Sequence, residues 1–116
     1  MKIIIAGSRS ITDFNTIEKP LIEYCKVHSV TEIVSGGARG VDSLGEQFAI
    51  KYNIKIKQFL ADWNKHGKSA GYIRNEKMGN YADTLIAFWD GQSKGTKHMI
   101  NYMKNLNKNV HIIKTE

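Results

Sequence analysis

The sequence predicts an α/β protein built as a three-layer sandwich, with a five-stranded parallel sheet in the order 3-2-1-4-5 and helices on both of its faces. Two observations support this fold class. Short apolar runs alternate along the chain with segments that have helical periodicity. Glycine-bearing loops follow three of the runs. Such an alternation is typical of parallel sheets, because right-handed crossover helices cover both faces of the sheet.

Five segments are predicted as strands: 3–6, 31–35, 54–59, 84–89 and 110–113. The first and the fourth are almost entirely apolar, which is typical of strands buried on both faces. The third alternates apolar residues with lysines, which places it near an edge of the sheet. No repeat, linker or low-complexity stretch divides the chain.

Three helices are predicted from apolar stripes with the spacing i, i+3, i+4 and i+7. The clearest stripe holds Val41, Leu44, Gly45, Phe48, Ala49 and Tyr52. A second stripe holds Thr96, Met99, Ile100, Met103 and Leu106. The segment 71–82 carries a third, with Ile73, Met78 and Tyr81.

The helix before the second strand has a less regular pattern. Ile17, Leu21, Tyr24 and Cys25 have helical spacing, and Asp13 is a candidate N-cap. Pro20 lies within this stripe, and proline removes a helical hydrogen bond. The helix is therefore expected to be kinked at Pro20 or to begin near Lys19.

The three glycine loops are expected to meet at one edge of the sheet. In the predicted strand order the topological switch point lies between the first and fourth strands, where the loops 6–9 (AGSR) and 90–96 (DGQSKGT) begin, and the loop 35–42 (SGGARGVD) lies beside them. A strand, a glycine turn and a helix direct backbone N–H groups and a helix N-terminus at one point, where an anion binds. Together the loops predict a nucleotide-sized ligand with phosphate.

Each loop, taken alone, has a purely structural alternative as a tight turn or a close helix contact. The spacing G-G-x-x-G of residues 36–40 is not the dinucleotide-binding fingerprint, and no obvious next strand ends in an acidic residue. Gly95 and Thr96 do not complete a Walker loop. The prediction of a phosphate site therefore depends on the three loops as a set.

The candidate ligand-binding residues lie in these loops or on the helices that follow them. They are Gly7, Ser8, Arg9, Gly36, Gly37, Arg39, Gly40, Asp42, Arg74, Asp90, Gly91, Ser93, Lys94, Gly95 and Thr96. An arginine fork suits phosphate, and serine and threonine hydroxyls donate to it. Asp42 is a candidate acceptor for a ribose hydroxyl or a base, with a role as a first-turn helix acid as the alternative.

Trp63 lies in a polar, lysine-rich loop at residues 62–68. A large aromatic side chain in such a loop either stacks on a nucleobase or packs back on the edge of the domain. Both interpretations stay open from the sequence.

Composition restricts the partners and the compartment. The net charge of +6 favours a polyanionic partner, either nucleic acid or a small phosphorylated ligand. Cys25, the single cysteine, excludes an internal disulfide and fits a reducing cytoplasm. The sequence shows no signal peptide, no apolar run of membrane-spanning length and no metal-ligand spacing, so we expect a cytoplasmic protein without membrane contact, metal or cofactor.

These motifs resemble those of the SLOG superfamily of Rossmann-like proteins over nearly the whole chain, and look closest to its small stand-alone YspA-like members. The loop 35–42 is similar to the S-G-x-A-x-G-I-D stretch of the DNA-processing protein A family. The loop 90–96 resembles the P-G-G-x-G-T loop of the Lonely Guy phosphoribohydrolases, and Arg74 and Met78 match the ends of their R-K-x-x-M motif. The resemblance implies a Rossmann-like fold and a single nucleotide-binding domain over residues 1–116.

The chain departs from the Lonely Guy pattern at two positions. Those enzymes release a base from a nucleoside 5′-monophosphate, using the motif arginine and a glutamate three positions after the G-T pair. Here Met99 stands in place of the glutamate and Asn75 in place of the motif lysine. The resemblance implies Arg74 as a catalytic candidate and Asn75 as a site residue, with Asp42 and Glu76 as the acids available to replace the glutamate.

Three classes of function follow. The favoured one is a sensor or processing enzyme that binds a nucleotide-like ligand; if the protein is an enzyme, N-glycosidic hydrolysis is the expected reaction. The alternative implied by the DNA-processing proteins is single-stranded DNA binding, which needs a basic groove with aromatic platforms. An interaction module without a ligand leaves the glycine loops unexplained. Lonely Guy relatives pair through helices beside the site, which implies a homodimer; Met99 and Met103 belong either to that surface or to the core.

Overall fold

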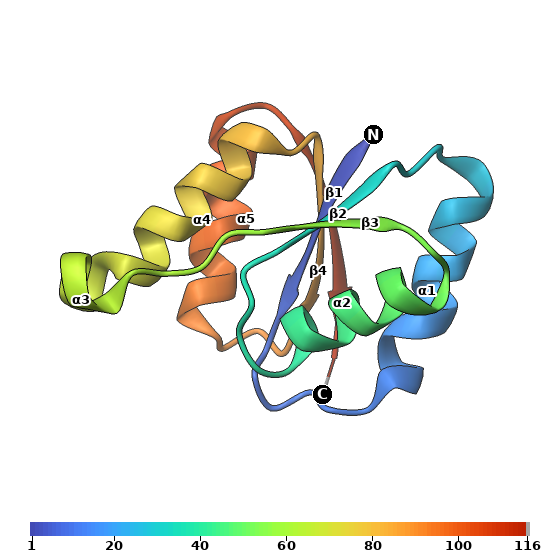
Figure 1. Cartoon of the computed structure of the whole chain (residues 1–116), viewed down its shortest axis with the longest axis horizontal. Helices are drawn as coiled ribbons and strands as arrows, with labels where there is room; N and C mark the ends of the chain where they lie inside the picture. Colours follow the sequence, from blue (N-terminus) through green and yellow to red (C-terminus); the bar gives the residue numbers. More distant parts are fainter. Residues whose placement is uncertain (116) are drawn as a thin grey trace.

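The computed structural model describes residues 1–115 and contains one five-stranded, wholly parallel sheet in the order β3-β2-β1-β4-β5. The strands are β1 (Lys2–Gly7), β2 (Glu32–Ser35), β3 (Lys55–Gln58), β4 (Thr84–Trp89) and β5 (Asn109–Lys114). Helices cover both faces of this sheet (Figure 1). The predicted fold class and strand order are confirmed.

Two helices lie on each face of the sheet. On one side are α1 (Phe14–Val27) and α2 (Val41–Lys51); on the other are α4 (Ala70–Tyr81) and α5 (Lys94–Asn105) (Figure 1). A short helix α3 (Trp63–His66) and a 3₁₀ turn (Gly67–Ser69) precede α4. The centre of the sheet is buried from both sides, because β1 and β4 contribute alternate residues to two separate apolar clusters, one under each pair of helices.

The first helix begins directly after its predicted N-cap, Asp13, and not near Lys19. It begins at Phe14 and continues through Pro20, with the Asp13 carboxylate accepting a hydrogen bond from the Asn15 amide at 3.0 Å. The expected start near Lys19 is therefore wrong. Pro20 removes one helical hydrogen bond, and full burial of Ile17 and Leu21 against the sheet outweighs that loss.

The loop expected at residues 62–68 is also more ordered than its composition indicated. Trp63–His66 form one helical turn because Asp62 caps it, accepting from the Lys65 amide at 3.1 Å. This turn fixes the position of Trp63, whose place in the fold matters for the site below.

Met99 and Met103 are buried in the cluster between the sheet and the helices α4 and α5, so they belong to the core rather than to a surface. Within residues 1–115, no helix has the length and apolarity that a membrane span requires.

Candidate functional site

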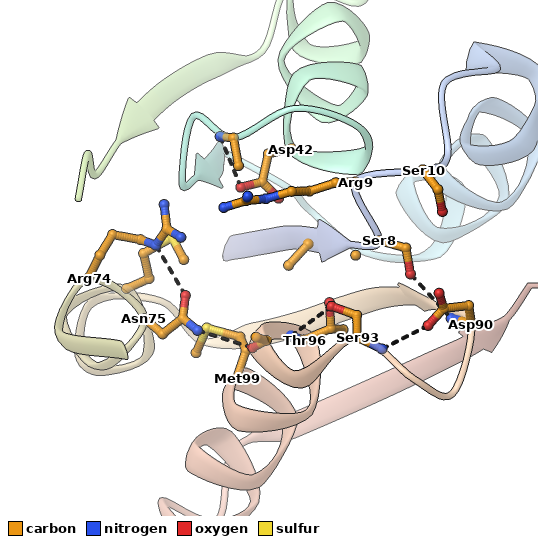
Figure 2. A pocket seen from close by; sticks show the side chains of 15 residues that line it. Ser8, Arg9, Ser10, Asp42, Arg74, Asn75, Asp90, Ser93, Thr96 and Met99 are labelled. Carbon is orange, nitrogen blue, oxygen red and sulfur yellow. Dashed lines mark hydrogen bonds between the residues drawn. The ribbon is translucent and has the colours of Figure 1, made fainter. Parts of the chain in front are cut away.

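A cavity of about 370 Å³ opens where β1 and β4 end, at the switch point of the sheet. Its wall combines the loop after β1, the first turns of α2 and α5, and the middle of α4 (Figure 2). The lining residues are Ala6, Gly7, Ser8, Arg9, Ser10, Ala38, Asp42, Arg74, Asn75, Met78, Asp90, Ser93, Gly95, Thr96 and Met99. We call it the first cavity.

Two glycines hold the loops of the first cavity close together. A Cβ atom on Gly7 would lie 2.2 Å from the Phe88 carbonyl oxygen, so no other residue fits between the ends of β1 and β4. Gly40 has φ +76°, and a Cβ there would lie 2.5 Å from both the Ser8 carbonyl oxygen and the Arg9 Cα atom. These glycines are required by the packing of the protein itself.

The N-terminus of α5 faces the first cavity. Ser93 caps it by accepting from the Thr96 amide at 3.4 Å, and Asp90 fixes the preceding turn by accepting from the Ser93 amide at 2.9 Å. Hydrogen bonds from the Gln92 and Ser93 amides lower the pKa of the Asp90 carboxyl. Within residues 1–115, the Lys94 and Gly95 amides have no acceptor, and a Cβ on Gly95 would meet no atom within 4 Å. The first turn of α5 therefore has free N–H donors and open space beside it.

Arg74 projects from α4 toward the loop after β2 (Figure 2). Its Nη1 donates to the Gly36 carbonyl oxygen at 2.5 Å, and its Nε donates to the Asn75 Oδ1 at 3.1 Å. The guanidinium is partly buried, which lowers its pKa, while the nearby Asp42 carboxylate opposes that effect. It stays a cation at neutral pH.

Asn75 connects Arg74 with the start of α5. Its Nδ2 donates to the Gly95 carbonyl oxygen at 3.1 Å and lies 3.3 Å from the His98 Nδ1. The side chain is 6% exposed and both ends of its amide are used inside the protein. Asn75 thus fixes the direction of the Arg74 guanidinium relative to the α5 N-terminus.

Asp42 is the buried acid of the first cavity. It is 7% exposed, and its Oδ2 accepts from the Ala38 amide at 3.3 Å. Burial raises the pKa of Asp42 to about 6, although the Ala38 amide and the positive charge of Arg74 act against the rise. A carboxyl in this state exchanges protons near neutral pH and accepts hydrogen bonds from a ligand hydroxyl.

Gly36 lies between Asp42 and Arg74. A Cβ on Gly36 would approach the Arg74 Nη1 to 2.6 Å and the Asp42 Oδ2 to 2.8 Å. Any other residue at this position would displace the ends of these two charged side chains from the positions they hold.

A second cavity, of about 390 Å³, continues from the first on the side of β3 and α3. Arg9, Ala38 and Arg74 line both cavities. The remaining lining residues of the second cavity are Gly36, Gly37, Arg39, Leu60, Ala61 and Trp63.

Most of the predicted site residues therefore come together at these two cavities. Gly40 lies just behind the loop after β1, and Gly91 and Lys94 are exposed beside the first cavity without lining it. Glu76 is not brought to either cavity: its side chain is half exposed and lies 3.8 Å from the His98 Nε2. Sequence reasoning missed Ser10, Ala38, Leu60 and Ala61, although Leu60 and Ala61 follow a predicted strand at the same edge.

The part of the chain that the structure describes, residues 1–115, has no group of three or more histidine, cysteine, aspartate or glutamate side chains placed to hold a metal ion.

Comparison with known proteins gives the family. Residues 1–66, which include the loops after β1 and β2, match the model of the YspA, cpYpsA-related SLOG family. The chain belongs to this family. It is also similar to the Gene 61 protein of Mycobacterium phage D29, with 35% identity over 106 residues that cover 84% of this chain and 83% of the relative. The resemblance to the SLOG superfamily is confirmed.

Among solved structures, this SLOG protein resembles the X-ray structure of DNA processing protein A from Streptococcus pneumoniae, with a TM-score of 0.80 and 16% sequence identity. The match covers 99% of this chain, which spans half the length of that protein. At this identity the similarity concerns the fold.

Proposed function

We propose that residues 1–116 form one domain that binds a nucleotide or nucleotide-derived ligand, with a phosphate group in the first cavity. The observation that carries the proposal is the convergence of two guanidinium groups, Arg9 and Arg74, with the open N-terminus of α5. Helix N–H groups and arginine forks are the donors that phosphate prefers in proteins. Membership of the SLOG family and the basic net charge of +6 fit such a ligand.

In this proposal the ligand is held by backbone amides and by side chains. The Lys94 and Gly95 amides and the Thr96 hydroxyl donate to the phosphate oxygens, and the positive charge of Arg74 balances the negative charge of the phosphate. The Asp42 carboxylate accepts a sugar hydroxyl. The Asp90 carboxylate accepts from the Gln92 and Ser93 amides in the turn before α5, and these contacts reduce its repulsion of an anionic ligand.

One observation favours turnover as well as binding: a buried carboxyl whose pKa is about 6 lies in the first cavity. In an N-glycosidic hydrolysis, ionised Asp42 takes a proton from water as the water oxygen bonds to the anomeric carbon. The bond from that carbon to the base breaks and the base leaves with the electron pair. The base takes up a proton from solvent, and Asp42 gives its own proton back to solvent, so the protons balance. Met99 lies beneath the cavity and offers no acid, and Glu76 points elsewhere.

Single-stranded DNA binding is the second candidate, favoured by the exposed Trp63 beside Arg39 in the second cavity. Binding to a strand involves several phosphates, so its affinity falls steeply as salt rises. Binding of one small nucleotide depends far less on salt, which separates the two candidates.

The proposal is tested by isothermal titration calorimetry of nucleoside monophosphates, NAD, ADP-ribose and a short single-stranded oligonucleotide, at low and moderate salt. We expect a salt-tolerant affinity for a small nucleotide that Arg74→Ala lowers by about tenfold or more, the value of a lost hydrogen bond to a charged group. Lys104→Ala, which removes an exposed charge in the last turn of α5, serves as the matched control and leaves affinity unchanged. Equal affinities of the wild type and Arg74→Ala would contradict the proposed phosphate site. The proposed reaction is tested separately, by measuring whether the protein releases free base from the compound that it binds.

A further inference from the structure

The second cavity differs from the first in the chemistry of its wall. Apolar side chains, Leu60, Ala61 and Trp63, form one part, and three guanidinium groups, Arg9, Arg39 and Arg74, form another. Among residues 1–115, no aspartate or glutamate side chain lines it. A wall of this kind suits a flat, electron-rich and uncharged group, because aromatic rings and guanidinium planes both stack on such groups.

Trp63 is held in place although 54% of its surface is exposed. It begins α3, which Asp62 caps. The ring edge lies 3.6 Å from the position that a Cβ atom on Gly71 would occupy, so the side chain is seated on the start of α4. An anchored and exposed indole presents a ring face without the loss of freedom that a mobile side chain would suffer on binding.

The opposite side of the second cavity is backbone. Gly36 and Gly37 line it there, the first buried and the second exposed. The loop is fixed from behind because the Ser35 hydroxyl accepts from the Gly37 amide at 3.1 Å and donates to Glu46 at 2.6 Å. Gly37 has φ +71°, and a Cβ on it would lie 2.6 Å from the Leu60 side chain. The space beside Leu60 and Trp63 is thus kept open by a rigid turn.

The two cavities are joined along Arg9, Ala38 and Arg74. With volumes of about 370 and 390 Å³, each is near the lower end of the range of about 300–1,000 Å³ for small-molecule sites. We propose that the second cavity is the nucleobase subsite, with the base stacked on Trp63, the sugar crossing at Arg74 and Asp42, and the phosphate at α5. This inference rests on the proposed phosphate site and deepens it, because it assigns the ligand a base as well as a phosphate.

The experiment compares each nucleoside 5′-monophosphate (AMP, GMP, CMP and UMP) with ribose 5-phosphate, which has the same sugar and phosphate and no base. Affinities are measured by calorimetry for the wild type, Trp63→Ala, Trp63→Phe and Arg74→Ala. Val27→Ala, which trims another exposed apolar side chain, is the matched control. A short oligodeoxyadenylate, titrated at low and moderate salt, shows whether the base comes from a free nucleotide or from a strand.

We expect Trp63→Ala to weaken the tightest monophosphate by at least about fivefold, the lower end for a base stacked on an aromatic ring, and to leave ribose 5-phosphate unchanged. Trp63→Phe retains most of the affinity, and Arg74→Ala weakens both compounds. The base subsite is overturned if Trp63→Ala leaves every monophosphate and the oligonucleotide unchanged, or if it weakens ribose 5-phosphate equally. If ribose 5-phosphate and the monophosphates all fail to bind the wild type, the phosphate site itself is wrong, and the inference falls with it.

Discussion

The Asp42 carboxyl is expected to make the fold less stable as pH rises, and replacing it with asparagine removes that effect. In the folded protein the pKa of Asp42 is raised from its ordinary value of 3.8 to about 6 by burial. The folded state therefore holds the Asp42 proton more tightly than the unfolded chain does. The stability that this proton provides is complete below pH 3.8 and is lost as the pH rises through 6.

The size of the effect follows from the pKa values. A change from 3.8 to about 6 corresponds to about 3 kcal/mol, since each pKa unit is worth 1.36 kcal/mol. About 2.5 kcal/mol of this falls between pH 4 and pH 7.5. Asp42→Asn keeps the shape of the side chain and an oxygen for the Ala38 amide, so the stability of this variant lacks the dependence that comes from Asp42.

The assay is urea unfolding followed by circular dichroism at several pH values between 4 and 7.5. The difference in unfolding free energy, Asp42→Asn minus wild type, is expected to rise by about 2.5 kcal/mol across this range. A constant offset at all pH values is allowed, because the two side chains differ in more than charge. Glu23→Gln is the control: its carboxylate pairs with Lys26 at 3.6 Å on the surface, and its difference stays within about 0.5 kcal/mol. Parallel curves for Asp42→Asn and the wild type would refute the assignment of Asp42 as the buried acid.

Four further substitutions separate the parts of the site from the fold. Gly95→Ala adds a methyl group that meets no neighbour and improves helix propensity, so the free energy of unfolding rises by about 0.5–1 kcal/mol. The methyl group lies where the phosphate is proposed to bind, so calorimetry with ribose 5-phosphate shows about tenfold weaker binding. Unchanged binding would place the anion elsewhere. Gly40→Ala costs about 2 kcal/mol or more in urea unfolding, because its Cβ would overlap the backbone of Ser8 and Arg9. Lys108→Ala lowers the free energy of unfolding by about 1–2 kcal/mol, because the Lys108 Nζ donates to the carbonyl oxygens of Gly79 and Ala82 at 2.8 Å at the C-terminus of α4. Ligand affinity stays unchanged in this variant, because these contacts lie far from the cavities. Asn75→Ala weakens ribose 5-phosphate binding, because Arg74 loses the acceptor that orients it; an affinity equal to the wild type would show that Arg74 is oriented without Asn75.

The order of elements in the fold could be predicted because its signals are local. Each strand contains a short run that is apolar or alternates apolar and polar residues, and each of the later helices has an apolar stripe. These patterns fix the βα alternation. Asp13 was predicted as the N-cap of α1, but the sequence could not decide whether the helix continues through Pro20. The disruptive effect of Pro20 is local, whereas the burial of Ile17 and Leu21 is a tertiary effect. The turn at Trp63–His66 depends on one capping contact from Asp62, which the polar composition of the segment conceals.

The site was predictable where it depends on strand ends, since all strands of a parallel sheet place their carboxyl ends at one edge. Arg74 and Asp42 could be selected because their side-chain types suit a phosphate and a sugar hydroxyl. Their approach to Gly36 could not be predicted, because Asp42 and Gly36 lie 32 and 38 positions before Arg74 in the chain and no sequence pattern indicates the contact. The position of Glu76 outside the cavities could not be predicted from the sequence either. This residue is adjacent to Asn75 on the same helix, yet the helical turn directs Asn75 inward and leaves Glu76 at the surface beside His98.

The glycines of the site have different physical reasons, and the difference bears on function. Gly7 and Gly40 are needed because backbone atoms of the protein occupy the space of a side chain. Gly36 leaves room for the ends of two charged side chains, which would have to move if a Cβ were present. Gly95 has no such reason among residues 1–115: it lies in the first turn of a helix, where glycine is unfavourable, and a Cβ on it would extend into open space. A glycine that costs helix stability and is not required by packing is best explained by a ligand that approaches the backbone at the α5 N-terminus, which is where the phosphate is proposed to bind.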